Sequence, residues 1–271
     1  MKNLPEILIS DADGTLVGTV SLIRHGQYET ARHFFVKHGI PVKEIPDYES
    51  YNNVLTKLVG GSAHDTLRRT TEAIYQNSPQ YTKNMDFDEM HNMLNPVQDE
   101  LAPEYAKAYE GLSSFLHSLG EAGISLAIFT SGTPHHIVRN FGFALPELGM
   151  GSAYKDSTQE DRKKLDEFTA RFAEYYQLPS FTVVTADDTK NHKPDPESVL
   201  IAAKRLGAEP LTAAVLGDHA VDMQAAQNAG AEIRIGITHG FDDAATLRAN
   251  GATHIADSFY DVKRYLGISS K

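Results

Sequence analysis

The chain has 271 residues, of which 36 are Asp or Glu and 25 are Lys or Arg, and its formal net charge at pH 7 is -11. So acidic a chain repels nucleic-acid phosphates and anionic lipid, and we therefore expect no nucleic-acid partner. The sequence contains no Cys, which excludes disulfides and thiolate metal sites and suits the reducing cytoplasm. Residues 1–9 are too short for the apolar part of a signal peptide, and no stretch approaches the length of a membrane span. We therefore expect a soluble cytoplasmic protein without a membrane partner.

Six short apolar runs end in turn-forming or acidic residues, which is typical of strands buried on both faces. They cover residues 7–10, 125–130, 181–184, 213–217, 233–237 and 253–256. Helical patterns lie between most of them, at residues 111–122, 134–141, 196–206, 221–229 and 244–249. Two of these helices begin at Thr133–Pro134 and Asp195–Pro196, where a capping side chain precedes a proline at the first helical position. This alternation predicts an α/β fold with a doubly wound parallel sheet covered by helices.

The alternation stops between Val17 and about Ala108, where apolar residues recur three and four positions apart as in helices. We therefore predict an α/β core of residues 1–16 and 108–271, with a helical cap of residues 17–107 inserted into it. A second irregular stretch, residues 149–180, contains a capping box at Ser157–Glu160. It is followed by four apolar residues on one helical face: Leu165, Phe168, Phe172 and Tyr176. This stretch predicts an extra helix packed on the core.

Four segments with reactive or anion-binding groups follow predicted strands, and open α/β sheets bind ligands at the carboxyl ends of their strands. In chain order they are DADGTL at residues 11–16, TSGT at 130–133, HKPDP at 192–196 and GDHAVD at 217–222. The first and last each supply two carboxylates, the second supplies hydroxyls and N–H groups at a helix start, and the third supplies a lysine. A solvated turn, a helix cap, a surface lysine or a chance acidic pair would explain any one of them alone. Their combination at the strand ends indicates a single site.

In this order and strand context, the four segments resemble the motifs of the haloacid dehalogenase superfamily, whose helical cap is inserted after the first motif. Residues 16–40 and, after the fourth motif, residues 225–230 and 238–241 are similar to the phosphoglycolate phosphatase-like branch. The resemblance covers nearly the whole chain. It implies a phosphatase that uses Mg²⁺ and an aspartyl-phosphate intermediate to hydrolyse a small phosphorylated metabolite.

The resemblance also implies a role for each matching residue. Asp11 would be the nucleophile, and Asp13 would protonate the leaving oxygen and then deprotonate water. Mg²⁺ prefers hard oxygen ligands, which would come from Asp11, the backbone carbonyl of Asp13 and Asp218, with Asp222 as a further ligand or as a group that orients the others. The transferred phosphoryl group would be neutralised by Thr130, Ser131, Gly132 and Lys193. Asp13 favours phosphate-ester chemistry, because dehalogenases of the superfamily lack this second carboxylate.

Three alternatives remain open at this stage. Sugar phosphomutases with a helical cap share all four motifs, and three cap cations, Lys57, Arg68 and Arg69, could hold a second phosphate. The segment Leu22–Gln27 (LIRHGQ) is similar to the signature of histidine phosphatases, in which His25 would be phosphorylated, but its helical spacing argues against this. The third alternative is a binding protein that has kept the fold and lost turnover. The identity of the metabolite and the oligomeric state, with a homodimer as one option, are not fixed by the sequence.

Overall fold

The computed structural model describes residues 5–58, 62–155 and 159–268. The chain divides into two compact units. The first comprises Met1–Thr19 and Ala106–Lys271, and the second comprises Val20–Tyr105. The second unit therefore begins three residues after the predicted start of the cap at residue 17 and ends two residues before its predicted end at residue 107.

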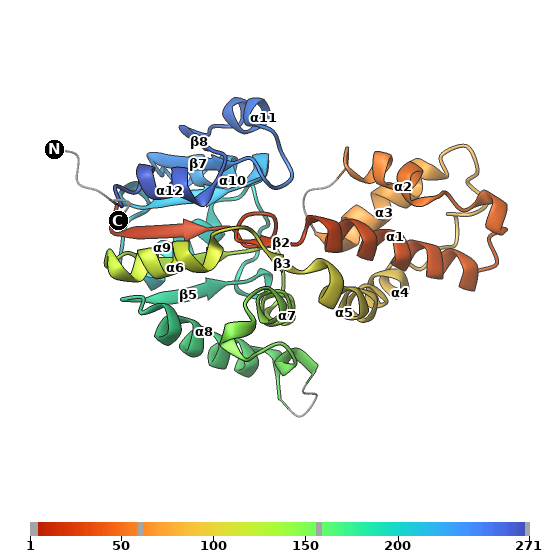
Figure 1. Ribbon diagram of the computed structural model, residues 1–271. Coiled ribbons are helices and arrows are strands. Elements are labelled where there is room, and N and C mark those ends of the chain that lie inside the picture. The colour runs from red at the N-terminus through yellow and green to blue at the C-terminus, as the bar shows by residue number, and fades with distance from the viewer. Residues whose placement is uncertain (1–4, 59–61, 156–158, 269–271) are drawn as a thin grey trace. The chain divides into compact units, whose positions relative to one another are not determined.

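The first unit is built on a six-stranded sheet in the order β5-β4-β1-β6-β7-β8, in which every neighbouring pair is parallel (Figure 1). The strands are β1 Ile7–Ser10, β4 Ser125–Phe129, β5 Phe181–Val184, β6 Ala214–Gly217, β7 Ile233–Ile237 and β8 His254–Ala256. Starting from β1, the chain adds β4 and β5 on one side and then returns to add β6, β7 and β8 on the other. This doubly wound topology confirms the predicted fold class, and its switch point lies at β1.

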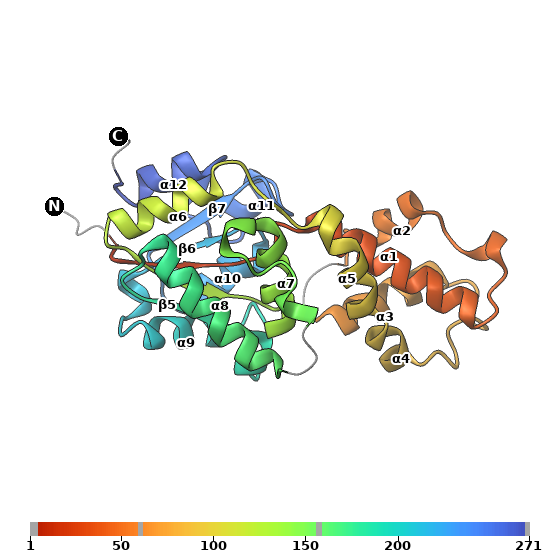
Figure 2. The same ribbon diagram turned by 60° about the horizontal axis from the view of Figure 1, so that its bottom comes forward.

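Helices cover both faces of this sheet (Figure 2). Their bounds are α6 Leu112–Glu121, α7 Pro134–Ala144, α8 Asp161–Tyr176, α9 Glu197–Arg205, α10 Ala220–Asn228, α11 Ala244–Ala249 and α12 Phe259–Tyr265. One apolar cluster joins alternate strand residues to α6, α7, α8 and α12, and another joins the remaining strand residues to α9 and α10. The strands are thus buried on both sides, which explains why their sequences read as unbroken apolar runs.

The predicted start of one helix is corrected by the structure. We expected Pro196 at the first helical position, but α9 begins at Glu197. Asp195 still acts as a cap, because its Oδ1 accepts a hydrogen bond from the N–H of Glu197 at 2.9 Å. The other proline-marked helix, α7, begins at Pro134 with Thr133 as its N-cap, as predicted.

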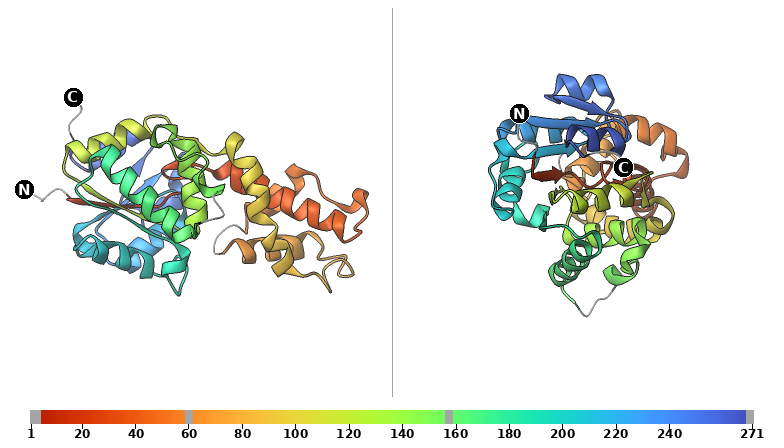
Figure 3. Two further views of the ribbon diagram at one scale, coloured as in Figure 1. Left: turned by 90° about the horizontal axis from the view of Figure 1, so that it is seen from below. Right: turned by 60° about the vertical axis from the view of Figure 1, so that its left-hand side comes forward.

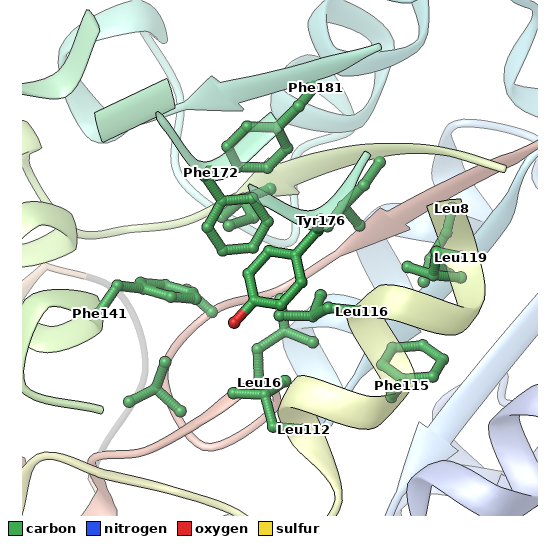
Figure 4. Packing of buried hydrophobic residues seen from close by; sticks show 14 of the residues in the cluster. Leu8, Leu16, Leu112, Phe115, Leu116, Leu119, Phe141, Phe172, Tyr176 and Phe181 are labelled. Atoms are coloured by element: carbon green, nitrogen blue, oxygen red, sulfur yellow. The ribbon is translucent and has the colours of Figure 1, made fainter. Parts of the chain in front are cut away.

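Helix α8 occupies the irregular stretch of residues 149–180 and packs on the core, as predicted. The four residues of its apolar face are at most 2% exposed. The rings of Phe172 and Phe181 stack at 4.4 Å, and Tyr176 lies beside them near Leu116 (Figure 4). Ser157 and Thr158 of the predicted capping box lie outside the described residues, and the N-cap of α8 is Glu160.

The second unit consists of helices (Figure 3), which pack around an apolar cluster of their own. They are α1 Val20–Lys37, α2 Tyr48–Leu55, α3 Ala63–Ile74, α4 Phe87–Asn92 and α5 Leu94–Tyr105. The chain leaves and re-enters the first unit through a two-stranded antiparallel ribbon, β2 Val17–Gly18 and β3 Lys107–Ala108. The ribbon explains why the unit boundaries fall a few residues inside the predicted cap. Among the described residues, no helix is long and apolar enough to cross a membrane.

Candidate active site

Three neighbouring strands deliver polar side chains to the same edge of the sheet. Asp11 follows the central strand β1, Thr130 follows β4 on one side, and Asp218 follows β6 on the other. The register aligns Ser10 with Ile128 of β4 and with Leu216 of β6, so all three strands end at nearly the same level. Residues separated by more than 200 positions in the sequence therefore meet at the switch point of the sheet.

A cluster of buried carboxylates lies at this point. One oxygen from each of Asp11, Asp218 and Asp222 lies within 4.8 Å of the others. The three residues are 7%, 1% and 2% exposed. Asp222 joins the cluster because it lies in the first turn of α10, four residues after Asp218. Among the described residues this is the one group of three or more acidic or histidine side chains close enough to hold a metal ion.

The buried ammonium of Lys193 lies against two members of the cluster. Its Nζ donates hydrogen bonds to Asp11 Oδ1 at 2.5 Å and to Asp222 Oδ1 at 2.8 Å. It also donates to the carbonyl of Phe129 at 3.1 Å and lies 3.8 Å from the centre of that residue's ring. These contacts hold the lysine at the carboxyl end of β4, next to the carboxylate expected to act as nucleophile.

The electrostatics of the cluster reflect an excess of negative charge. Burial raises the pKa of Asp11 to about 7, although the ammonium of Lys193 opposes this shift. Burial, together with the charge of Asp11, raises the pKa of Asp218 well above its usual value. Burial disfavours the charged form of Lys193, but Asp11 and Asp222 outweigh it and raise the pKa of the lysine. Three ionised carboxylates and one ammonium carry a net charge of -2, which a divalent cation would neutralise.

The side chain of Asp218 is fixed by a donor at each of its oxygens. The hydroxyl of Thr15 donates to Oδ1 at 2.6 Å, and the N–H of Phe241 donates to Oδ2 at 2.8 Å. Two glycines make room for this arrangement. A Cβ added at Gly14 or at Gly240 would overlap the carboxylate of Asp218, and Gly14 also has a φ of +88°.

Because of this close approach, we expect Gly240→Ala to destabilise the protein by about 1–3 kcal/mol and to lower activity by displacing Asp218. Gly132→Ala is a milder comparison, because the nearest atom to its added Cβ would be Thr130 Oγ1 at 3.2 Å. Urea unfolding of both variants measures the difference. Equal stability of Gly240→Ala and the wild type would contradict the close approach.

Asp13 lies in a different environment from the cluster. It is partly exposed, and its Oδ1 accepts hydrogen bonds from the hydroxyl of Thr19 and from the side-chain amide of Asn140, both at 2.8 Å. Among the described residues, no protein group donates to its other oxygen, Oδ2. The structure thus leaves one oxygen of Asp13 available to a substrate.

The predicted phosphate-binding segment lies at the end of β4. Thr130 is buried and its N–H donates to the carbonyl of Val184 at 2.9 Å, whereas Ser131 is exposed. The N–H of Gly132, which we expected to face a phosphate, donates to Thr130 Oγ1 at 2.9 Å. This contact orders the loop, but it also means that this amide already has a partner.

Several residues that hold the site had no role predicted from the sequence: Thr15, Thr19, Arg139, Asn140 and Phe241. Thr15 and Phe241 contact Asp218 from 203 and 23 positions away, and no local pattern marks either contact. A weak signal existed for Arg139 and Asn140, since this polar pair interrupts the apolar run from Ile137 to Phe141. Both side chains are nearly fully buried, at 1% and 3% exposed.

The histidine expected of a histidine phosphatase has different surroundings. His25 lies inside α1, where its ring stacks between Tyr48 at 4.1 Å and Tyr105 at 4.6 Å. The signature of histidine phosphatases requires this histidine to follow a strand, and His25 does not. A histidine phosphatase also needs a second histidine, for which Thr238–Gly240 (THG) would supply His239. This residue belongs to the first unit, where its ring stacks on Tyr109 at 3.7 Å and its Nε2 lies 2.9 Å from the carbonyl of Thr15. The geometry of the chain therefore argues against a phosphohistidine mechanism.

Comparison with known proteins agrees with this geometry. The chain is 26% identical over 266 residues to pyrophosphatase PpaX of Bacillus velezensis, which covers 96% of each chain. It is 28% identical over 208 residues to a phosphoglycolate phosphatase of Salmonella choleraesuis, covering 75% of this chain and 68% of that one. The crystal structure of CbbY from Rhodobacter sphaeroides, in complex with phosphate, has the same fold with a TM-score of 0.61 and 20% identity, covering 97% of this chain and 100% of that one. The haloacid dehalogenase-like hydrolase family matches residues 5–230, and the chain belongs to this family.

Proposed function

We propose that the protein is a Mg²⁺-dependent phosphatase that hydrolyses a small phosphomonoester through an aspartyl-phosphate on Asp11. The observation that carries the proposal is the buried group formed by Asp11, Asp218, Asp222 and Lys193 at the switch point of the sheet. Membership of the hydrolase family and the names of its phosphatase relatives support it.

The donor set fits a hard divalent cation. Carboxylate oxygens are the ligands that Mg²⁺ prefers, and the cluster's net charge of -2 matches that of the ion in magnitude. Asp11, Asp218 and the backbone carbonyl of Asp13 would hold it. Asp222, which accepts hydrogen bonds from Lys193 and from the N–H of His219 at 3.0 Å, would serve as a further ligand or orient the others. The bound ion would supply charge neutralisation at the phosphoryl oxygens.

Asp11 is suited to attack phosphorus. The hydrogen bond from Lys193 holds its Oδ1, and among the described residues Oδ2 receives no donor. Attack by Asp11 forms an acyl phosphate, and the departing oxygen takes a proton from Asp13. In the second half of the reaction, Asp13 takes a proton from water as the water attacks phosphorus. Inorganic phosphate leaves, and both carboxyl groups return to their starting states.

The phosphoryl group would be neutralised by groups at the end of β4. Lys193 supplies a buried positive charge, and Thr130 and Ser131 supply a hydroxyl each at the start of the loop before α7. Positive charge that is already in place where the transferred phosphoryl group lies lowers the barrier without reorganisation during the reaction. Gly132 contributes by ordering this loop through its contact with Thr130.

We further propose that the unit Val20–Tyr105 acts as a cap that selects small metabolites and that the enzyme works in the cytoplasm. The pyrophosphatase and phosphoglycolate phosphatase names of the relatives make pyrophosphate and phosphoglycolate the first substrates to test. A panel of phosphorylated metabolites, with phosphate release and sugar-phosphate isomers both measured, distinguishes a phosphatase from a sugar phosphomutase. Phosphate release from no member of the panel would contradict the proposal.

Removal of the metal provides a direct test. We expect EDTA to lower phosphate release from p-nitrophenyl phosphate more than about tenfold, because it removes the cation that would neutralise the phosphoryl oxygens beside the carboxylates. Added Mg²⁺ should restore the activity, whereas Ca²⁺ prefers more ligands at longer distances and should restore less. Full activity in EDTA would exclude the metal-dependent mechanism. Circular dichroism in EDTA serves as the control that the protein remains folded.

A further inference from the structure

Helix α7 places a buried polar pair behind the partly exposed Asp13. Arg139 and Asn140 are 1% and 3% exposed, although their helix is otherwise packed through apolar residues of the core. The Nε of Arg139 lies 3.0 Å from Oδ1 of Asn140, and the Nδ2 of Asn140 lies 2.8 Å from Oδ1 of Asp13. Burying a guanidinium and an amide costs free energy unless their hydrogen bonds are satisfied, so the arrangement invites a functional explanation.

The chemistry of the arginine fixes the orientation of the amide. A guanidinium N–H can only donate, so the atom of Asn140 that faces Arg139 must be the carbonyl oxygen. The NH₂ group of Asn140 must then face Asp13, to which it can only donate. The oxygen that accepts this hydrogen bond cannot itself carry a proton toward Asn140, because two donors would then face each other.

The hydroxyl of Thr19 donates to the same oxygen, Oδ1, at 2.8 Å. Oδ1 of Asp13 is therefore held by two donors from two different segments of the first unit. Oδ2 receives no donor among the described residues. The two oxygens of a single carboxylate are thereby made unequal, one anchored by the protein and one available to exchange a proton.

We propose that Arg139 and Asn140 form a positioning pair that anchors Oδ1 of Asp13 and reserves Oδ2 for proton transfer to the leaving-group oxygen. This inference rests on the proposed function, in which Asp13 is the general acid. As the bond from Asp11 to phosphorus forms and the ester P–O bond breaks, the proton on Oδ2 passes to the departing oxygen. Asn140 acts through Asp13 and does not contact the reacting atoms.

The dependence of activity on the leaving group tests this role. A general acid matters most for an alkoxide leaving group and least for p-nitrophenolate, which departs readily without a proton. The measured quantity is kcat/KM, because it reports the steps up to release of the leaving group and excludes the later breakdown of the acyl phosphate. We expect Asn140→Leu, which has a similar shape and no donor, to lower kcat/KM about 100-fold for an alkyl phosphate such as phosphoglycolate. The loss on p-nitrophenyl phosphate should be about fivefold or less.

Two further measurements separate positioning from a structural effect. Thr19→Val removes the second donor and should shift the leaving-group ratio in the same direction, whereas Thr19→Ser keeps the hydroxyl and should retain the wild-type ratio. In the background of Asp13→Ala, Asn140→Leu should change the ratio no further, because its effect passes through Asp13. A general loss of structure would lower activity on both substrates equally and would leave the ratio unchanged.

The outcomes also separate this inference from the proposed function. If Asp13→Ala does not change the leaving-group ratio, Asp13 is not the general acid and the proposed mechanism fails. If Asp13→Ala changes the ratio but the folded Asn140→Leu and Thr19→Val variants do not, the mechanism stands and the positioning role is overturned. A ratio that shifts in all three variants supports both.

Discussion

Replacement of Asp11 by Asn is expected to lower phosphate release at least about 10⁴-fold while leaving the protein folded. The amide has nearly the shape of the carboxylate and its oxygen can still accept the hydrogen bond from Lys193. It cannot form an acyl phosphate. Burial raises the pKa of Asp11 to about 7, so the native carboxylate is costly to ionise and the variant loses no stability from its removal. We expect its melting temperature to equal or exceed that of the wild type.

Phosphate release with and without Mg²⁺, together with thermal unfolding, measures both parts of this prediction. Asp187→Asn is the matched control, because Asp187 is an exposed aspartate of the same unit and its replacement should leave both quantities unchanged. Hydroxylamine provides an independent measurement, since it cleaves an acyl phosphate and leaves a hydroxamate on the attacked residue. A hydroxamate found on Asp11 in the wild type and absent from the variant would identify the nucleophile. Turnover by Asp11→Asn near the wild-type rate would show that Asp11 is not the nucleophile.

The elements of the core could be predicted because their signals are local. Each of the six strands is an apolar run bounded by turn residues, and the run from Ile7 to Ser10 ends one residue before Asp11, which enters the site. Nine of the twelve predicted strand ends match the observed ones and the other three differ by one residue, as at Thr130, which follows β4 instead of ending it. β4 ends at Phe129 because Phe129 and Val184 are the last pair in the register with β5, although the N–H of Thr130 still donates to the carbonyl of Val184.

The main carboxylates could also be placed together from the sequence alone. In a parallel sheet all carboxyl ends lie at one edge, so a residue that follows β1 must lie near one that follows β6 when those strands are neighbours. The buried lysine is a different case. Lys193 follows β5 by nine residues, and only the path of the intervening loop determines that its ammonium contacts Asp11.

The residues that orient the carboxylates could not be predicted. Asn140 lies 127 positions from Asp13, and their contact depends on how α7 is rotated about its axis above the sheet. The need for glycine at position 240 depends on how closely that loop approaches Asp218. Such contacts follow from tertiary packing, which leaves no periodic or local pattern in the sequence. The sequence therefore identifies the groups that do the chemistry more readily than the groups that hold them.

Replacement of Lys193 by Met is expected to destabilise the metal-free protein by about 3–5 kcal/mol, because Asp11 and Asp222 then lose their buried counter-ion. Met keeps most of the apolar stem and removes the ammonium, which lies 3.8 Å from the centre of the Phe129 ring, so the loss is chiefly electrostatic. Activity should fall about 10²–10³-fold, as expected when one preorganised positive group at a transferring phosphoryl is removed.

Urea unfolding in EDTA measures the loss of stability. Lys190→Met is the matched control, because Lys190 is an exposed lysine three positions earlier and its replacement should change neither stability nor activity.

Lys193→Met also tests the charge balance of the cluster. Without the ammonium, ionisation of the carboxylates meets stronger mutual repulsion, so a divalent cation relieves more repulsion than it does in the wild type. Added Mg²⁺ should therefore stabilise Lys193→Met by more than it stabilises the wild type. An equal increase in the two proteins would mean that the cation and the lysine do not share the same carboxylates.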